Sequence, residues 1–256
     1  MKKLVVGLLA MGFTLSVQAF DFGSLGDKLK GILNKDSSSS TSQTTTKSAI
    51  DSLTPTEING GLKEALTKGA EAAVAQLGKT DGFWSDPKLR IPLPANLQKV
   101  SKVMKTLGMG RQVDALELGM NRAAEAAVPE AKTLLVGAVK SMSLEDAKGI
   151  LTGGDTAATD FFRKKTETQL TEKFLPIVKS TTDKVGLAQT YNTYAGAAAR
   201  FGAIKSDQAS IEHYVTKEGL DRLYKVIGEQ EKAFRANPLQ SGSELIKKVF
   251  GALIGK

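Results

Sequence analysis

The chain has 256 residues, no cysteine, one histidine and a formal net charge of +8 at pH 7. Without cysteine there can be no disulfide, thiolate catalysis, zinc–cysteine site or lipidated cysteine of a bacterial lipoprotein. One histidine excludes a histidine-rich metal site, and we expect neither a metal nor another cofactor. The densest basic groups are Arg163-Lys164-Lys165 and Lys247-Lys248, too short for a nucleic-acid arm, so we expect a mixed-charge surface and no nucleic-acid partner.

Residues 1–19 have the pattern of a secretory signal peptide. Lys2-Lys3 forms a basic region, residues 4–15 an apolar region, and residues 17–19 supply the small side chains of a cleavage site. The apolar run is shorter than the roughly 20 residues of a membrane-spanning helix. The sequence therefore predicts export to the periplasm.

Two segments precede the predicted domain. Residues 20–34 are expected to form a short amphipathic helix, because apolar side chains recur at helical spacing at Phe22, Leu25, Leu29, Ile32 and Leu33. This helix packs on the protein itself or, as the alternative, makes weak contact with a membrane surface. Residues 35–48 are mostly Ser and Thr and are expected to form a disordered linker, so the folded domain is predicted over 49–256.

The first helices of the predicted domain follow from apolar residues that recur with a period of 3.6. Thr54-Pro55-Thr56-Glu57 has the form of a capping box, which predicts a helix from there to Gly78. Two further stripes predict helices that end near Gly108 and Pro129. Between Gly78 and the first of these stripes, Leu89-Arg90-Ile91-Pro92-Leu93-Pro94 alternates like a strand, but its two prolines favour an extended loop.

The second half of the chain continues the helical pattern, which predicts helices over 134–142, 144–151, 158–185, 187–201, 220–234 and 245–250. Ser143, Asp155, Thr216 and Ser243 are expected to cap four of them. Pro176 is expected to kink or split the long helix over 158–185. The predicted fold class is therefore all-α, an irregular multi-helix bundle of about eight to ten helices.

Five strings occur in an order that points to a known family. They are Asp81-Gly82-Phe83-Trp84, Ile91-Pro92-Leu93-Pro94, residues 120–125, residues 153–162 and Tyr214-Val215-Thr216. Over roughly residues 50–251 the chain resembles the exported bacterial proteins grouped as domain of unknown function family 4197. The resemblance implies an all-helical domain of the cell envelope, and it brings no catalytic residues because that family has no assigned activity.

The predicted start of the long helix carries four polar candidate residues. Asp155 and Thr159 lie one helical turn apart, as do Thr156 and Asp160. A helix cap with side-chain bonds to a neighbouring helix would explain them. The alternative is a polar recognition or cation site.

Asn121, Arg122 and Glu125 on another predicted helix are further candidates for that site. Arg122 and Glu125 have the i,i+3 spacing of an ion pair. Such a pair either fixes the packing or lines a binding cleft. If Arg122 met Asp155 or Asp160 across the core, a structural role would suffice, because a buried charge must be paired.

The loop over 81–94 holds the only tryptophan, Trp84, with Asp86 and Arg90 nearby. Aromatic residues in loops either anchor the loop to the body or contact a ligand, so these three residues are candidates for binding. His213 lies in no catalytic motif and is expected at the surface or at a helix cap.

Scarce catalytic residue types favour a non-enzymatic binding or scaffolding protein of the cell envelope. Its partner would be an envelope protein, a lipid or a small apolar ligand held between helices. The alternative function is a carboxylate-dependent hydrolase acting on envelope glycan or peptide material. That chemistry requires carboxylates that converge in a pocket near Trp84.

Overall fold

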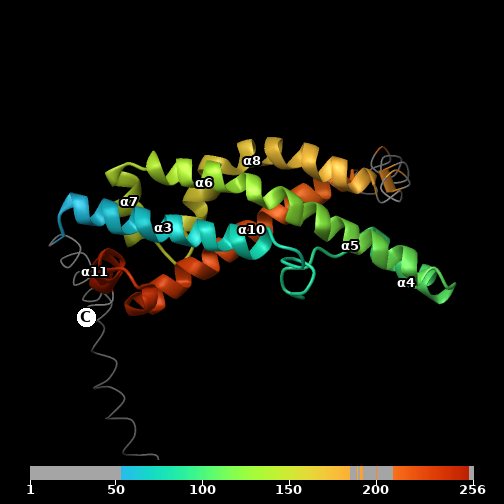
Figure 1. The fold of residues 1–256 in the computed structure, drawn as a ribbon, viewed down its shortest axis with the longest axis horizontal. Helices are drawn as coiled ribbons and strands as arrows, with labels where there is room; N and C mark the ends of the chain where they lie inside the picture. The colour runs from blue at the N-terminus through green and yellow to red at the C-terminus, as the bar shows by residue number, and fades with distance from the viewer. Residues whose placement is uncertain (1–52, 185–188, 190, 193–199, 201–209, 254–256) are drawn as a thin grey trace, which may run out of the picture. The chain divides into compact units, whose positions relative to one another are not determined.

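The computed structural model describes residues 53–184, 189, 191–192, 200 and 210–253 (Figure 1). The predicted signal peptide, amphipathic segment and linker, and most of the predicted helix over 187–201, lie outside the described residues. Within the described ranges the chain forms helices joined by turns and loops, with no β-strand. The all-α, multi-helix fold class is therefore confirmed.

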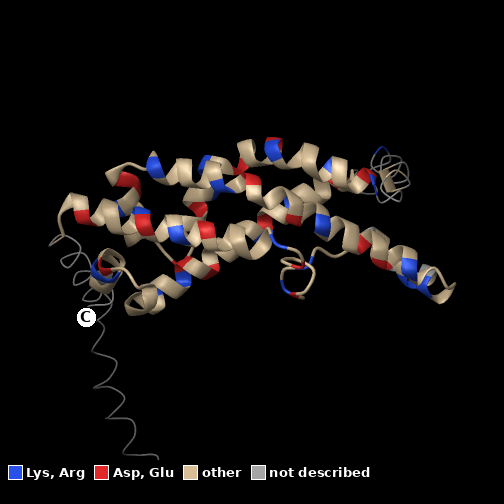
Figure 2. Ribbon diagram, in the orientation of Figure 1, with Lys and Arg blue, Asp and Glu red and all other residues tan. Residues whose placement is uncertain are grey.

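The α-helices occur close to where the apolar periodicity predicts them. Their bounds are α3 (Pro55–Leu77), α4 (Ala95–Thr106), α5 (Gly110–Ala127), α6 (Ala131–Lys140), α7 (Leu144–Thr152), α8 (Ala157–Asp183), α10 (Ile211–Ala236) and α11 (Glu244–Leu253), with 3-10 turns η1 (Val128–Glu130) and η3 (Pro238–Ser241). Basic and acidic residues are interspersed along most of these helices (Figure 2). Among the described helices, none combines the length and the hydropathy of a membrane-spanning segment.

The predicted capping box begins α3, and the predicted Ser143 cap of α7 is also part of a capping box. At α3 the Thr54 hydroxyl accepts from the Glu57 N–H, and the Glu57 carboxylate accepts from the Thr54 N–H at 2.9 Å. Ser143 and Asp146 form the same reciprocal pair at the start of α7. Each box satisfies backbone donors that a helix start leaves without an intrahelical partner.

Two other predicted caps are wrong. Thr156, not Asp155, is the N-cap residue of α8, and its side chain makes no capping bond. Thr216 lies buried inside α10, which begins at Ile211 with Ser210 as its cap. The buried face of α10 starts with Ile211 itself, so this helix extends further towards the N-terminus than its later apolar stripe indicates.

Pro176 does not split α8, which is continuous from Ala157 to Asp183. The proline itself is exposed, while Phe174 and Val178 on either side are fully buried. Tertiary packing of these neighbours therefore holds the helix through a residue that costs an isolated helix about 3 kcal/mol.

Helices α8 and α10 pack along one another, and α5 contacts both of them. Phe162 and Phe174 of α8 and Tyr224 of α10 are fully buried. The Tyr224 hydroxyl lies 2.9 Å from the Thr166 hydroxyl, and burial raises the pKa of Tyr224 to about 12. The one polar group of this aromatic core residue is thus hydrogen-bonded, as burial requires.

Helix α3 lies against α10, α6 and α11 (Figure 1). Its approach to α11 depends on Gly61, where a Cβ atom would lie 2.6 Å from Val249 Cγ2 and 2.7 Å from the Leu245 carbonyl oxygen. At the adjacent Gly60 the nearest atom would be a Leu245 methyl carbon at 3.8 Å, an ordinary contact.

We predict that Gly61→Ala lowers the free energy of unfolding by about 1–3 kcal/mol, because a methyl group forces α11 away from α3. Gly60→Ala is the matched control and should raise it by up to about 1 kcal/mol, since alanine favours helix and the site has room. Urea unfolding followed by circular dichroism measures both. Equal effects of the two substitutions would contradict the close approach.

The Glu57 carboxylate also links α3 to α11. Its pKa is lowered from 4.5 to about 2, first by a hydrogen bond from Lys248 of α11 and then by the bonds from Thr54. A depressed pKa in the folded state means that the carboxylate stabilises the fold above about pH 4.5 and that this contribution is lost as the pH falls towards 2.

We therefore predict that Glu57→Gln makes stability less dependent on pH between about 4.5 and 2. Urea unfolding midpoints across this range measure the effect. Glu145→Gln, at an exposed glutamate without an ion pair among the described residues, serves as the control. A Glu57→Gln protein that follows the wild-type pH profile would show that the pKa is not depressed.

Candidate functional site

The loop over residues 79–94 joins α3 to α4 and begins with a tight reversal (Figure 1). Asp81 has φ of 65°, a left-handed conformation that aspartate tolerates better than most residues. At Gly82 a Cβ atom would lie 2.5 Å from the carbonyl oxygen of Leu77. The Asp-Gly pair therefore turns the chain back onto the end of α3.

Four apolar side chains of the loop are buried and anchor it in the core. The buried side chains are those of Phe83, Leu89, Ile91 and Leu93. Trp84 remains partly exposed, so it is Phe83 and not the tryptophan that anchors this part of the loop.

Three sequence-predicted candidates stabilise the outer part of this loop. The Arg90 guanidinium lies 4.2 Å from the centre of the Trp84 ring and donates to the Trp84 carbonyl at 2.8 Å. The Asp86 carboxylate accepts from the Lys88 N–H at 2.8 Å, which closes a local turn. All three side chains are partly exposed.

Glu125 of α5 holds the start of the loop. Its buried carboxylate accepts from the N–H groups of Phe83, at 3.1 Å, and Trp84, at 3.3 Å. Arg122 donates to Glu125 at 2.6 Å and to Asp81 at 2.8 Å, and the hydrogen bond with Glu125 raises the pKa of Arg122. Arg122 thus pairs with Asp81, which was not among the predicted site residues, and not with Asp155 or Asp160.

Asn121 of α5 holds the end of the loop. Its fully buried amide accepts from the Ile91 N–H at 2.8 Å and donates to the Ile91 carbonyl at 2.9 Å. The same amide nitrogen donates to the Glu117 carbonyl at 2.8 Å. Both amide hydrogens are used. The Asn121 side chain thus makes the two hydrogen bonds to Ile91 that a neighbouring β-strand would make to an extended residue.

Helix α10 holds the loop from a second side. The Tyr214 hydroxyl donates to the Pro92 carbonyl at 3.0 Å, and burial raises the pKa of Tyr214. Arg222 donates to the Arg90 carbonyl at 3.1 Å. Sequence reasoning did not assign these two residues to the loop, because no local pattern relates positions more than 100 residues apart.

The Glu231 carboxylate of α10 lies at the start of α8, where the sequence predicts Asp155 as the cap. Its buried carboxylate accepts from the N–H groups of Ala158, at 3.0 Å, and Thr159, at 3.2 Å. Arg235 donates to Glu231 at 2.8 Å and to the Ile150 carbonyl near the end of α7 at 2.7 Å. An acid at a helix start and a base at a helix end both complement the helix dipoles. The i,i+4 spacing of Glu231 and Arg235 is the sequence signal for this pair.

The structure does not join the candidates at 155–160 to those at 121–125. Asp155, Thr156 and Asp160 are exposed, and Asp160 accepts from Thr156 at 3.1 Å. No hydrogen bond or ion pair between described residues connects the two groups. No group of three or more His, Cys, Asp or Glu side chains in the described ranges is placed to hold a metal ion.

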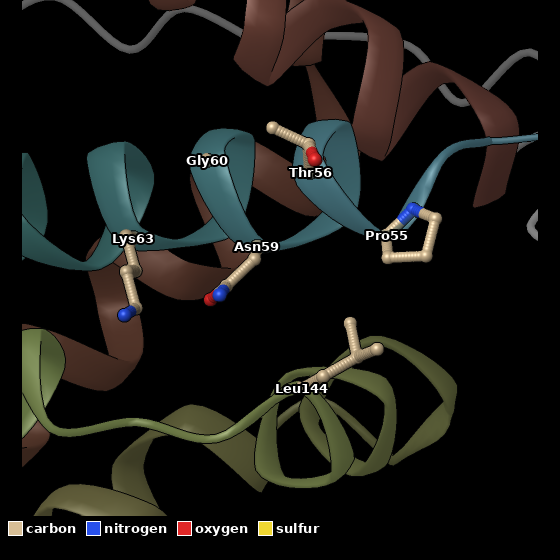
Figure 3. Close-up of a pocket in the computed structure, with 6 residues that line it drawn as sticks. All are labelled: Pro55, Thr56, Asn59, Gly60, Lys63 and Leu144. Carbon is tan, nitrogen blue, oxygen red and sulfur yellow. The ribbon is translucent and has the colours of Figure 1, made fainter.

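A shallow pocket of about 380 Å³ lies between the start of α3 and α7 (Figure 3). It is lined by Pro55, Thr56, Asn59, Gly60, Lys63 and Leu144. The buried Asn59 Oδ1 has no hydrogen-bond partner among the described residues, while Lys63 donates to the Lys140 carbonyl at 3.0 Å. No carboxylate lines the pocket, and it contains none of the sequence-predicted residues.

We predict that Asn121→Ala lowers the free energy of unfolding by about 2–4 kcal/mol, because it leaves the buried N–H and carbonyl of Ile91 without partners. The Ile91 amide should also exchange faster with deuterium. Gln112→Ala, at an exposed position of the same helix, should change stability by less than about 0.5 kcal/mol. A loss for Asn121→Ala no larger than this control would contradict the role of the amide.

The comparison with protein families finds the same family that the five sequence strings indicate. A family model described as "Protein of unknown function (DUF4197)" matches residues 52–251, which is more than half of the chain. No curated protein and no solved structure matches it. The chain therefore belongs to the DUF4197 family of proteins of unknown function.

Proposed function

We propose that this protein is a non-enzymatic binding or scaffolding domain of the cell envelope, and that the loop over 79–94 forms its binding surface. The signal-peptide pattern of residues 1–19 supports export. One observation carries the binding function: Trp84 and Arg90 stay partly exposed on a loop whose backbone is bonded to both α5 and α10.

The chemistry of this loop favours a protein partner. Trp and Arg are enriched among the residues that contribute most to protein–protein binding. The Arg90 guanidinium over the Trp84 ring combines a flat apolar surface with a positive charge. Because the backbone is already held by Glu125, Asn121 and Arg222, binding would order little of the loop, which lowers the entropic cost of association.

The hydrolase alternative receives no support from the arrangement of acids. Glu125 already accepts from two backbone N–H groups and from Arg122, so it is not available to a substrate. Asp155 and Asp160 lie exposed at the start of α8, and the pocket between α3 and α7 contains no acid. The binding function is therefore the one that we propose.

The test uses a photo-crosslinking amino acid at Lys88, an exposed position of the loop that leaves Trp84 in place, in cells that export the protein. We expect a discrete protein adduct whose yield falls about tenfold or more when Trp84→Ala is added, as for a residue central to an interface. The same probe at Lys232, exposed on α10, should give no such adduct.

Two results would overturn the proposal. One is the absence of any adduct at Lys88 beyond the Lys232 control. The other is an adduct whose yield does not depend on Trp84. Circular dichroism of each variant establishes that a lost adduct reflects lost contact and not unfolding.

A further inference from the structure

Large apolar side chains are exposed together at the turn between α4 and α5. The described structure exposes five such side chains, and three of them lie within seven residues. Val103 is 59% exposed, Leu107 73% and Met109 41%. A local group of exposed aliphatic residues marks a contact surface more strongly than isolated ones do.

The same stretch of sequence is basic. Residues 95–113 contain no Asp or Glu and four basic residues, Lys99, Lys102, Lys105 and Arg111. Lys105 pairs with Asp114 of α5 at 2.7 Å. Lys102 and Arg111 are exposed, and neither takes part in an ion pair with a described residue. Figure 2 shows basic residues of α4 where the α4–α5 pair ends.

The packing of α4 leaves this turn accessible. Among the described elements, α4 packs chiefly on α5, and the two helices are joined by a short turn. Gly108 has φ of 83° and allows the reversal, with nothing within 4 Å of where its Cβ would lie. The turn lies at one end of the long helices in Figure 1, while the loop over 79–94 contacts the opposite end of α5.

We propose that the α4–α5 turn, defined as residues 102–111, docks on an anionic phospholipid bilayer. Val103, Leu107 and Met109 enter the apolar part of the interface, and Lys102 and Arg111 contact the headgroups. The apolar side chains match the acyl region of such a bilayer, and the basic side chains match its anionic headgroups. A nucleic acid would neutralise the lysines and arginine but would gain nothing from exposed aliphatic side chains.

This docking is independent of the proposed binding loop and of residues 20–34. The test uses the protein purified after export, with vesicles of phosphatidylcholine alone or mixed equally with phosphatidylglycerol. We expect co-sedimentation with the mixed vesicles, weakened by salt, and little binding to phosphatidylcholine. Leu107→Asn should weaken binding about tenfold, because one apolar side chain no longer enters the interface.

Leu239→Asn is the matched control, since Leu239 of η3 is 71% exposed, nearly as much as Leu107, and lies outside the α4–α5 turn. It should bind as the wild type does. Lys102→Gln with Arg111→Gln should weaken binding about tenfold at low salt, while Lys164→Gln with Lys173→Gln, both exposed on α8, should not.

A second measurement does not depend on loss of binding. Because the chain lacks cysteine, Leu107→Cys provides a single site for an environment-sensitive fluorophore. Its emission should shift to the blue and increase with the mixed vesicles, whereas the same label at Leu239→Cys should not respond.

Three outcomes would overturn the docking proposal. The first is vesicle binding that Leu107→Asn leaves unchanged, which would assign the membrane contact to another segment. The second is a label at position 107 that stays in water on bound vesicles. The third is salt-sensitive binding to duplex DNA, unaffected by Leu107→Asn, without binding to the vesicles.

Discussion

Buried backbone donors at chain reversals must be hydrogen-bonded, and this requirement shapes the described domain. Two buried carboxylates from other helices meet it. Glu125 of α5 bonds the N–H groups of Phe83 and Trp84 after α3, and Glu231 of α10 bonds those of Ala158 and Thr159 at the start of α8. Each is paired with an arginine one helical turn away, Arg122 or Arg235. Because a buried charge is costly when unpaired, these pairs connect helix packing directly to the path of the loops.

These Glu–Arg pairs explain why residues whose types suggest a binding site support the fold instead. Glu125, Asn121 and Arg122 have the residue types of a polar binding site, yet each is bonded to the loop over 79–94. In the proposed binding function their effect is indirect, since they hold the loop that carries Trp84 and Arg90. A loop built in this way is already ordered before a partner arrives, which is the physical basis of the proposed binding function.

The two proposed contact surfaces differ in the forces that they would use. The loop combines a rigid backbone with an aromatic ring and an arginine, which suits a shaped protein surface. The α4–α5 turn combines exposed aliphatic side chains with basic residues. This combination suits a bilayer whose apolar interior lies beneath anionic headgroups. Helix α5 connects them, with Asn121 and Glu125 near one end and Met109 just before the other. A domain that contacts a membrane and a protein partner at separate places would serve as a scaffold.

Local interactions determined what the sequence revealed by itself. The helical periodicity, the capping box at Thr54, the Ser143 cap and the non-strand character of residues 89–94 depend on neighbours a few positions apart, so they could be predicted. Only the tertiary structure decided that Arg122 also pairs with Asp81, that Glu231 caps α8 and that Leu107 is exposed. Periodicity shows that a residue lies on one face of a helix, but not which distant element covers that face. Asp81 meets Arg122, and Glu231 meets Ala158, because helix packing brings them together, and α4 leaves Leu107 uncovered because it packs chiefly on α5.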